Sequence, residues 1–269
     1  PRRHPRRAQY LRPDARDAPR RLSEEDAFTK PFLIDAGEPA LGLCHAIPTS
    51  PGFGVSNIVK LVGSRKRVEV IDVGTQQLYD GFTLKEWGEY FERASERDRT
   101  LNVISLEVTN TPLAKLVASP RIVRSIDWID RVWPEAYRKR KSPAFPKVQL
   151  YCLMSVRNSY TDWHIDFGGS SVWYHVKRGK KLFWIAPPTD QNLSVYRAWL
   201  TSPVSTQGNT QFLGDSLAGV FRAEIIVGQT LFIPSGWLHA VFTPVDSIVF
   251  GGNFLHGHAI RMQLRVNVI

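Results

Sequence analysis

The stretch TLFIPSGWLHAVFTPVDSIVF, residues 230–250, decides the fold class. It contains three short runs rich in Val, Ile, Leu and Phe, at residues 230–233, 238–242 and 247–250, separated by segments that carry Pro or Gly. Runs of this length and composition between turn residues are typical of short antiparallel strands. The stretch therefore predicts a mainly β domain.

The same pattern continues outward from this stretch. Further runs that we expect to be strands lie at residues 68–73, 101–108, 149–156, 171–176, 181–185 and 262–268. Many short strands at this spacing, most of them after Lys147, predict a sandwich or barrel.

Two helices are expected upstream of the strand-rich half. Thr83 and Glu86 form a capping box, and apolar residues then recur at helical spacing over residues 84–94. The second helix is expected to begin at Ser119 and Pro120 and to run to residue 132, before Pro134.

Composition limits the class of protein. The chain has 269 residues, 43% hydrophobic and 22% charged, which suits one domain with a small accessory lobe and excludes a chain disordered throughout. No run of about 18 apolar residues occurs, so no membrane span is predicted. Two cysteines, Cys44 and Cys152, are too few for a disulfide framework or a four-thiolate zinc site, which favours a reducing compartment.

The net charge of +10 is concentrated at the N-terminus. Residues 1–22 hold eight Arg and two Asp, hence +6, which leaves +4 for the other 247 residues. Four prolines interrupt this segment, so we expect residues 1–25 to form a disordered arm. The arm and the basic loop at residues 138–141 would suit contacts with DNA phosphates, and the alternative for both is a solvated charge run without a partner.

Three residues of the strand-rich half could share one metal ion. His164 and Asp166 are two positions apart, and such positions of a strand point to the same face. His239 follows 75 residues later, at the start of the second run in the opening stretch. Two His and one carboxylate inside a small barrel form the facial triad typical of non-haem Fe(II) oxygenases. The alternative for His239 alone is a hydrogen-bonded core histidine.

Lys181 is a candidate anchor for an anion. It opens an apolar strand in which Phe183 and Ile185 share its face. If that face is interior, the ammonium needs a partner, because an unpaired buried charge is costly, and a bound carboxylate would supply one. The opposite register, with Lys181 in solvent, stays open at this point. Thr161 and Tyr174 bring hydroxyl groups nearby in the sequence.

Six motifs, in this order and spacing, resemble those of the JmjC-domain histone lysine demethylases. They are NVISLE at residues 102–107, YCLMSV at 151–156, YTDWHIDFGG at 160–169, SVWYH at 171–175, IPSGWLHAV at 233–241 and FGGNFLH at 250–256. The phrase FWIAPPT at residues 183–189, with FLGD at 212–215, is most similar to the subfamily that acts on lysine-36 of histone H3. The sister subfamily, which pairs JmjC with a PHD finger and acts on other histone lysines, is the alternative.

The resemblance implies a fold, a chemistry and a set of site residues. The fold is mainly β with flanking helices, a cupin-like double-stranded β-helix of jelly-roll type. The chemistry is demethylation of mono- or dimethylated lysine that depends on Fe(II), 2-oxoglutarate and O2, and releases formaldehyde, succinate and CO2. By this resemblance His164, Asp166 and His239 are iron ligands, Thr161 and Lys181 hold the distal carboxylate of 2-oxoglutarate, and Asn102 and Tyr174 make further co-substrate contacts.

The resemblance also assigns a methyl-lysine pocket. Asn253 would lie near the methylated ammonium. Gly168 and Gly169 have no side chain and would let the methyl group approach the iron, and a backbone turn is the alternative explanation for both glycines. The expected substrate is a methylated histone H3 tail or a nucleosome, which implies a nuclear protein.

Three domains and some departures from the family are expected. The domains are the arm at residues 1–25, an α+β lobe at 26–99 and the JmjC catalytic domain at 100–269. Trp163 stands where relatives usually carry Phe, and alternation points it away from the metal, so altered packing rather than lost iron is expected. Residues 201–211 resemble a variable loop. The short segment after Met262 lacks the helical extension expected of the family, and no reader module is present, so the chain is expected to be a catalytic fragment.

Three other functions are compatible with parts of this pattern. A protein hydroxylase of the same fold would leave a stable alcohol. A chromatin-binding pseudoenzyme is disfavoured by the intact set of three metal-ligand candidates. A zinc or manganese jelly-roll protein acting on small molecules would not account for Lys181.

Overall fold

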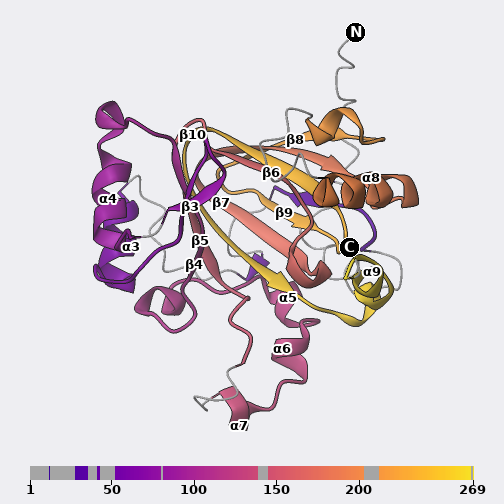
Figure 1. The fold of residues 1–269 in the computed structure, drawn as a ribbon. Helices are drawn as coiled ribbons and strands as arrows, with labels where there is room; N and C mark the ends of the chain where they lie inside the picture. The colour runs from indigo at the N-terminus through magenta and orange to yellow at the C-terminus, as the bar shows by residue number, and fades with distance from the viewer. Residues whose placement is uncertain are drawn as a thin grey trace.

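The computed structural model describes residues 12, 28–35, 41–42, 52–79, 81–138, 145–202, 212–267 and 269. Its centre is a ten-stranded sheet in the order β1-β9-β7-β10-β5-β4-β2-β3, in which β6 pairs with β10 and β8 pairs with β7 (Figure 1). The strands are β1 (Phe32–Ile34), β2 (Val70–Asp72), β3 (Gln77–Tyr79), β4 (Leu101–Glu107), β5 (Tyr151–Ser155), β6 (Tyr160–His164), β7 (Ser171–Ala186), β8 (Phe221–Ile226), β9 (Thr230–Ile233) and β10 (Leu238–Phe254). Every described pairing is antiparallel, so the predicted mainly β jelly-roll class is confirmed.

Helices flank the sheet on two sides. In Figure 1, α3 and α4 lie at the left of the sheet, and α8 and α9 lie at the right. The helices are α3 (Val55–Val62), α4 (Leu84–Glu92), α5 (Arg121–Arg124), α6 (Trp128–Arg131), α7 (Glu135–Arg138), α8 (Asp190–Thr201) and α9 (Ile260–Val266). Short 3-10 turns are η1 (Ala94–Glu96), η2 (Pro112–Lys115), η3 (Phe167–Gly169), η4 (Leu213–Asp215) and η5 (Gly257–Ala259).

Two long strands replace four expected short ones. Residues 171–176 and 181–185 both belong to β7, and residues 238–242 and 247–250 both belong to β10, so their division into separate strands is wrong. The Gly and Pro residues between the runs produce register shifts within β7–β10 pairing rather than chain reversals. Gly179 has φ +78, and a Cβ there would overlap the carbonyl oxygen of Asp246, so only glycine fits this close approach.

The first expected helix is confirmed and the second is split. Thr83 caps α4, because its Oγ1 accepts from the Glu86 N–H at 3.3 Å while Glu86 Oε2 accepts from the Thr83 N–H at 2.7 Å. The expected helix from residue 119 to 132 is instead α5 and α6. Asp127 separates them, because its side chain caps α6 through the Ile129 N–H and also accepts from Gln149.

The C-terminal run is a helix rather than the expected strand. Residues 260–266 form α9, so the prediction of a strand at 262–268 and the statement that no helical extension follows are both wrong there. Met262 and Val266 alternate with polar residues like a strand, but they are also four positions apart and share one helix face. That face packs against Gly236 and Gly169, which have no side chain to keep it away.

The upstream strands join the same sheet as the strand-rich half. β2 and β3 pair with each other, and β2 pairs with β4 through Ile71 and Asn102. The boundary at residues 99/100 stays a prediction, since this pairing crosses it. The arm at residues 1–25, apart from Arg12, the basic loop at 139–141 and most of the variable loop at 201–211 lie outside the described residues. Among the described helices, none has the length and apolar character needed to cross a membrane.

Candidate metal centre and its cavity

Three sequence-predicted residues meet at one point of the barrel. His164 is the last residue of β6, and its partner across the sheet is His239 in β10. Asp166 lies just beyond β6, at the start of the η3 turn, rather than inside a strand as expected. One donor atom from each residue lies within 4.8 Å of the others, and His239 Nε2 is 3.6 Å from Asp166 Oδ2. The three side chains can therefore share one cation.

Backbone contacts fix both imidazole rings. His164 Nδ1 lies 2.8 Å from the carbonyl oxygen of Asp162, and His239 Nδ1 lies 3.1 Å from that of Trp237. A carbonyl only accepts, so each Nδ1 carries a proton, and Nε2 is the ring nitrogen left to face a ligand. Burial, reinforced by His164, lowers the pKa of His239 to about 4, so this ring is neutral at pH 7. Two histidines and one carboxylate are a donor set that suits a divalent transition metal.

A cavity of about 260 Å³ opens on the three donors. Its walls follow the two-residue alternation of the strands, since Tyr151, Leu153 and Ser155 line it from β5. The remaining lining residues are Ile104, Ser105, Thr161, His164, Asp166, Phe167, Val172, Trp173, Tyr174, Lys181, Phe183, Ile233, His239, Val241, Gly251, Gly252 and Asn253. The cavity therefore combines an apolar wall with a few polar groups, as ligand sites generally do.

Lys181 points into this cavity from β7. Its side chain is buried on the same face as Phe183 and Ile185, so the interior register is confirmed and the solvent register is excluded. The ammonium Nζ donates to Ser155 Oγ at 2.6 Å and to Thr243 Oγ1 at 2.7 Å. Burial lowers the pKa of Lys181 to about 7, because loss of water disfavours the charged ammonium.

The other predicted co-substrate residues lie around the same cavity. Thr161 and Tyr174 line it, and burial raises the pKa of the Tyr174 phenol, which keeps that group protonated as a donor. Asn102 lies behind Thr161, where its Nδ2 donates to Thr161 Oγ1 at 3.4 Å. Asn102 Oδ1 is buried without a hydrogen-bond partner among the described residues.

Comparison with known families decides the identity of the strand-rich half. The model of the family described as "JmjC domain, hydroxylase" matches residues 151–254, a range that contains all three metal-ligand candidates and Lys181. The chain is a JmjC-domain protein.

Relatives of this JmjC domain include named demethylases. The chain is 46% identical over 262 residues to lysine-specific demethylase 2A of Xenopus tropicalis, an alignment that covers 94% of the chain and 22% of the relative. It is 47% identical over 225 residues to lysine-specific demethylase 2B of Mus musculus, covering 80% of the chain and 17% of the relative. It is 46% identical over 242 residues to histone lysine demethylase PHF8 of Danio rerio, covering 90% of the chain and 22% of the relative. The chain thus spans about a fifth of the length of these relatives.

The predicted methyl-lysine residues of the JmjC domain lie at one side of the cavity. Asn253 lines the cavity, donates from Nδ2 to Ser170 Oγ at 2.8 Å, and lies 3.4 Å from Asp166 Oδ1. Gly168 and Gly169 both have φ +60 and neither is among the lining residues. A Cβ on Gly169 would overlap Val266 of α9, so backbone conformation and packing account for this glycine.

Trp163 faces away from the metal-ligand candidates, as alternation predicts. Its buried ring belongs to a separate hydrophobic cluster with Leu193 and Tyr196 of α8. The ring centroid lies 6.4 Å from that of Phe212. The expectation of altered packing without a direct role at the metal centre is consistent with this position.

Sequence analysis missed three polar partners in this JmjC domain. They are Ser155 and Thr243, which accept from Lys181, and Ser170, which accepts from Asn253. Strand alternation could have indicated two of them. Ser155 lies two residues after Leu153, and Thr243 lies two and four residues after Val241 and His239, so each shares a strand face with residues of the cavity. Ser170 follows the η3 turn, where no such periodicity applies.

Proposed function

We propose that this JmjC-domain chain is an Fe(II)- and 2-oxoglutarate-dependent dioxygenase that demethylates mono- or dimethylated lysine on histone H3, with lysine-36 as the preferred residue. The observation that carries this proposal is the convergence of His164, Asp166 and His239 on a cavity that also holds the buried Lys181. A metal centre and an anion anchor in one cavity match the two needs of a 2-oxoglutarate oxygenase.

In this proposal the metal is held by His164 Nε2, His239 Nε2 and Asp166 Oδ2. The carbonyls of Asp162 and Trp237 at the two Nδ1 atoms would orient both rings so that Nε2 faces the metal. Iron held there, with 2-oxoglutarate and O2, would supply the oxidising power for demethylation of an N-methyl group, with formaldehyde, succinate and CO2 as products and no need for a protein base.

The chain's own residues would orient the co-substrate. Lys181 and Thr161 would bind the distal carboxylate, and Tyr174 would donate from its phenol. Asn102 would hold Thr161 in place from behind. The apolar lining, with Phe183 and Val241, would limit the access of water to the reacting groups.

The histone substrate is supported by the names of the relatives. Three of them are named as lysine-specific or histone lysine demethylases, which supports a methylated lysine as substrate and hence a nuclear location. Asn253, which lines the cavity, would contact the methylated ammonium. The arm at residues 1–22 and the loop at 138–141 would contact nucleosomal DNA.

The choice of lysine-36 rests on the motif at residues 183–189. The relatives do not separate the subfamilies, because identity is 46% to demethylase 2A and 46% to PHF8. The second candidate function is protein hydroxylation, which the family description "hydroxylase" favours. The two chemistries differ in product, since a hydroxylase adds oxygen mass and releases no formaldehyde.

Mass spectrometry of histone H3 peptides tests the proposal. Peptides dimethylated at one lysine each are incubated with the chain, Fe(II), ascorbate and 2-oxoglutarate, with His164→Ala as the matched inactive variant. Loss of methyl mass and release of formaldehyde from the lysine-36 peptide alone, absent in His164→Ala, is the expected result. Loss from another peptide would move the substrate site, a gain of oxygen mass would favour the hydroxylase, and no change in any peptide would contradict the proposal.

A further inference from the structure

One part of the cavity wall is built around Lys181. Lys181, Ser155 and Thr243 are all buried, and the two hydroxyl oxygens accept from Nζ at 2.6 and 2.7 Å. They come from three different strands, β7, β5 and β10. The position of the ammonium is therefore fixed by where β5 and β10 place their hydroxyls.

The hydrogen-bonding capacity of this group leaves one donor for a ligand. An ammonium has three N–H donors and no acceptor, and two of them are committed to Ser155 and Thr243. The remaining N–H belongs to a side chain that lines the cavity. Each hydroxyl accepts from Lys181 and so keeps its own proton for donation. The remaining N–H of Lys181 and the hydroxyl of Ser155, which both belong to residues that line the cavity, can therefore donate to a carboxylate.

The backbone of Thr243 is tied to the segment that follows Ser155. The Asn158 N–H donates to the Thr243 carbonyl at 2.7 Å, and the Thr243 N–H donates to the Ser159 carbonyl at 2.9 Å. Thr243 is thus held on both sides by the segment that follows Ser155. A shift of one hydroxyl would shift the other.

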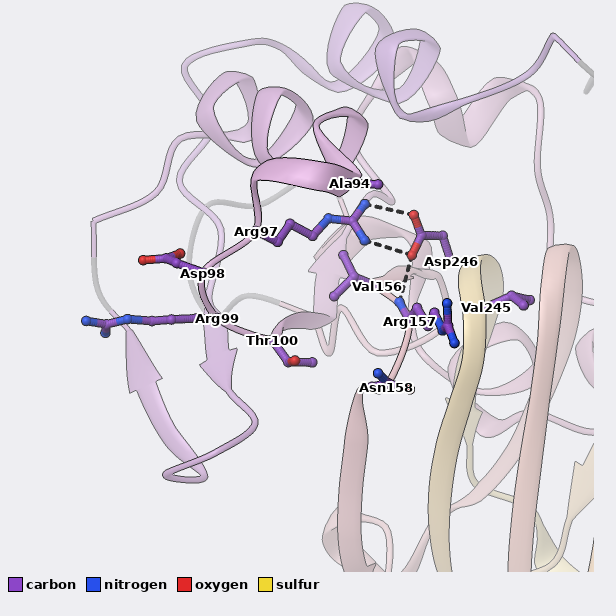
Figure 2. Close-up of a pocket in the computed structure, with 10 residues that line it drawn as sticks. All are labelled: Ala94, Arg97, Asp98, Arg99, Thr100, Val156, Arg157, Asn158, Val245 and Asp246. Atoms are coloured by element: carbon purple, nitrogen blue, oxygen red, sulfur yellow. Dashed lines mark hydrogen bonds and ion pairs between the residues drawn. The ribbon is translucent and has the colours of Figure 1, made fainter.

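An ion pair on the outer side of this wall holds the same two segments. Asp246 accepts from the Arg97 guanidinium at 2.9 and 2.7 Å, and its Oδ1 also accepts from the Arg157 N–H at 2.7 Å. Arg157 follows Ser155 by two residues, and Asp246 follows Thr243 by three. Figure 2 shows these contacts as dashed lines between the helical segment and the strand ends, at an outer pocket of about 440 Å³.

Arg97 is itself firmly placed. Its side chain is 10% exposed, and its guanidinium lies 5.6 Å from the Tyr90 ring centre and 5.5 Å from that of Phe91. It also donates to the carbonyls of both residues at the end of α4. Although burial raises the pKa of Asp246, hydrogen bonds from Arg97 and Arg157 hold it below its usual value, so the pair stays charged at neutral pH.

We propose that Ser155 and Thr243 are positioning residues for Lys181, and that the Arg97–Asp246 ion pair positions the two strand ends that carry them. The inference rests on the proposed function in one respect, that Lys181 binds a carboxylate of 2-oxoglutarate. The proposal gives the segment before residue 100 an indirect part in the site, because Arg97 pairs with Asp246, which follows Thr243 by three residues.

Calorimetric titration of 2-oxoglutarate into the Mn(II)-loaded chain tests the inner contacts. Thr243→Val and Ser155→Ala each remove one acceptor and are expected to raise the dissociation constant about tenfold, while the dissociation constant for Mn(II) stays unchanged. Thr243→Ser keeps the hydroxyl and is expected to bind within about twofold of the parent. Parent-like binding by both hydroxyl-deleted variants, or an equal loss in Thr243→Ser, would overturn the inner assignment.

The outer ion pair is tested in the same titration. Asp246→Asn is expected to raise the dissociation constant for 2-oxoglutarate about threefold to tenfold with Mn(II) binding unchanged, whereas Arg99→Gln, at the same outer pocket, has no effect. Parent-like binding by Asp246→Asn, or loss of Mn(II) together with 2-oxoglutarate, would overturn the positioning role. A parent chain that binds Mn(II) but no 2-oxoglutarate would instead contradict the proposed function.

Discussion

Lys181 places an ammonium group in the cavity, where its hydrogen bonds among the described residues go to the hydroxyls of Ser155 and Thr243. A buried cation with only neutral partners is costly, which is why burial lowers its pKa to about 7. A bound dianion would reverse this cost. The charge on Lys181, and with it the affinity for co-substrate, therefore depends on pH in the neutral range.

Affinity for 2-oxoglutarate is expected to fall as the pH rises through about 7. The ammonium is present below the lowered pKa of Lys181 and is lost above it, so the dissociation constant should rise roughly tenfold between about pH 6.5 and 8.5. The other ionisable groups facing the cavity are His164, Asp166, His239, Tyr151 and Tyr174. His239, with a pKa of about 4, does not change charge in this range.

Titration of 2-oxoglutarate at saturating Mn(II) over this pH range measures the effect. Lys181→Arg is the control, because a guanidinium stays charged throughout, and its weaker binding should be independent of pH. A parent affinity that is flat with pH, or one that rises with pH, would contradict the assignment of Lys181 as the charged anchor.

Asn253 is expected to act on the metal as well as on the substrate. Its amide lies 3.4 Å from Asp166 Oδ1, while Oδ2 of the same carboxylate faces His239. Contacts behind a metal ligand typically change metal affinity about tenfold to a hundredfold, so Asn253→Ala should raise the Mn(II) dissociation constant about tenfold. If Asn253→Ala leaves the Mn(II) dissociation constant unchanged and raises only the KM for the methylated peptide, the predicted effect on the metal is wrong. Contact with the substrate would then be the only role of Asn253.

The three metal-ligand candidates could be predicted from their types and spacing, whereas the co-substrate roles of the other site residues came from the resemblance to JmjC demethylases. His239, Lys181 and Thr161 lie on strands, where alternation fixes the inward face once one residue is placed. Asp166 converges on the site from a turn, so its position follows from the chain path after β6 and not from alternation. The partners of Lys181 come from strands far apart in sequence, and single-sequence patterns do not show which strands are neighbours.

Helix α9 packs against the η3 turn. Val266 and Gln263 of α9 pack directly against Gly169, next to the segment that carries Asp166. The contact leaves no space for a side chain on that glycine. We therefore expect α9 to support the turn that presents the carboxylate.

Two neighbouring glycines provide a matched test of this packing. Both have φ +60. A Cβ on Gly168 would meet nothing within 4 Å, whereas a Cβ on Gly169 would overlap the Val266 side chain and lie 3.1 Å from Gln263 Cα. Gly168→Ala should cost about 1 kcal/mol of unfolding free energy for the backbone alone, and Gly169→Ala about 3 kcal/mol because overpacking adds to it. Urea denaturation of both variants measures the difference, and equal losses would contradict the packing account.

Helices whose ends are fixed by neighbouring residues could be predicted from the sequence. Helices whose ends depend on residues distant in sequence could not. The capping box at Thr83 predicted α4 because both partners lie within one turn. The division of residues 119–132 depends on Asp127, whose partner Gln149 lies 22 residues away. The α9 pattern fits a strand or a helix equally, and only packing on Gly169 and Gly236 decides it.

At the scale of the whole molecule, the segment before residue 100 is joined to the strand-rich half by sheet pairing and by an ion pair. β2 continues the sheet beyond β4, and Arg97 pairs with Asp246 across 149 positions of sequence. The net charge of the chain is concentrated at the N-terminus, where residues 1–22 carry +6 of the net +10. This distribution matters for a partner with many phosphates.

Deletion of residues 1–22 is expected to weaken binding to a short DNA duplex. If the arm contacts phosphates, the slope of log affinity against log salt should become shallower by up to about 5, in proportion to the charge removed. Replacing Asp14 and Asp17 by Asn, which keeps every arginine, should not weaken binding. Equal slopes for the full and shortened chains would contradict a DNA contact by the arm.

The most direct test of the candidate centre is a metal titration of the whole chain. Calorimetry with Mn(II), followed by 2-oxoglutarate, should give one metal ion per chain and then one co-substrate, with the second step dependent on the first. His164→Ala, Asp166→Ala and His239→Ala should each abolish metal binding while retaining a cooperative melting transition. Metal binding that survives in these variants, or 2-oxoglutarate binding without metal, would contradict the account.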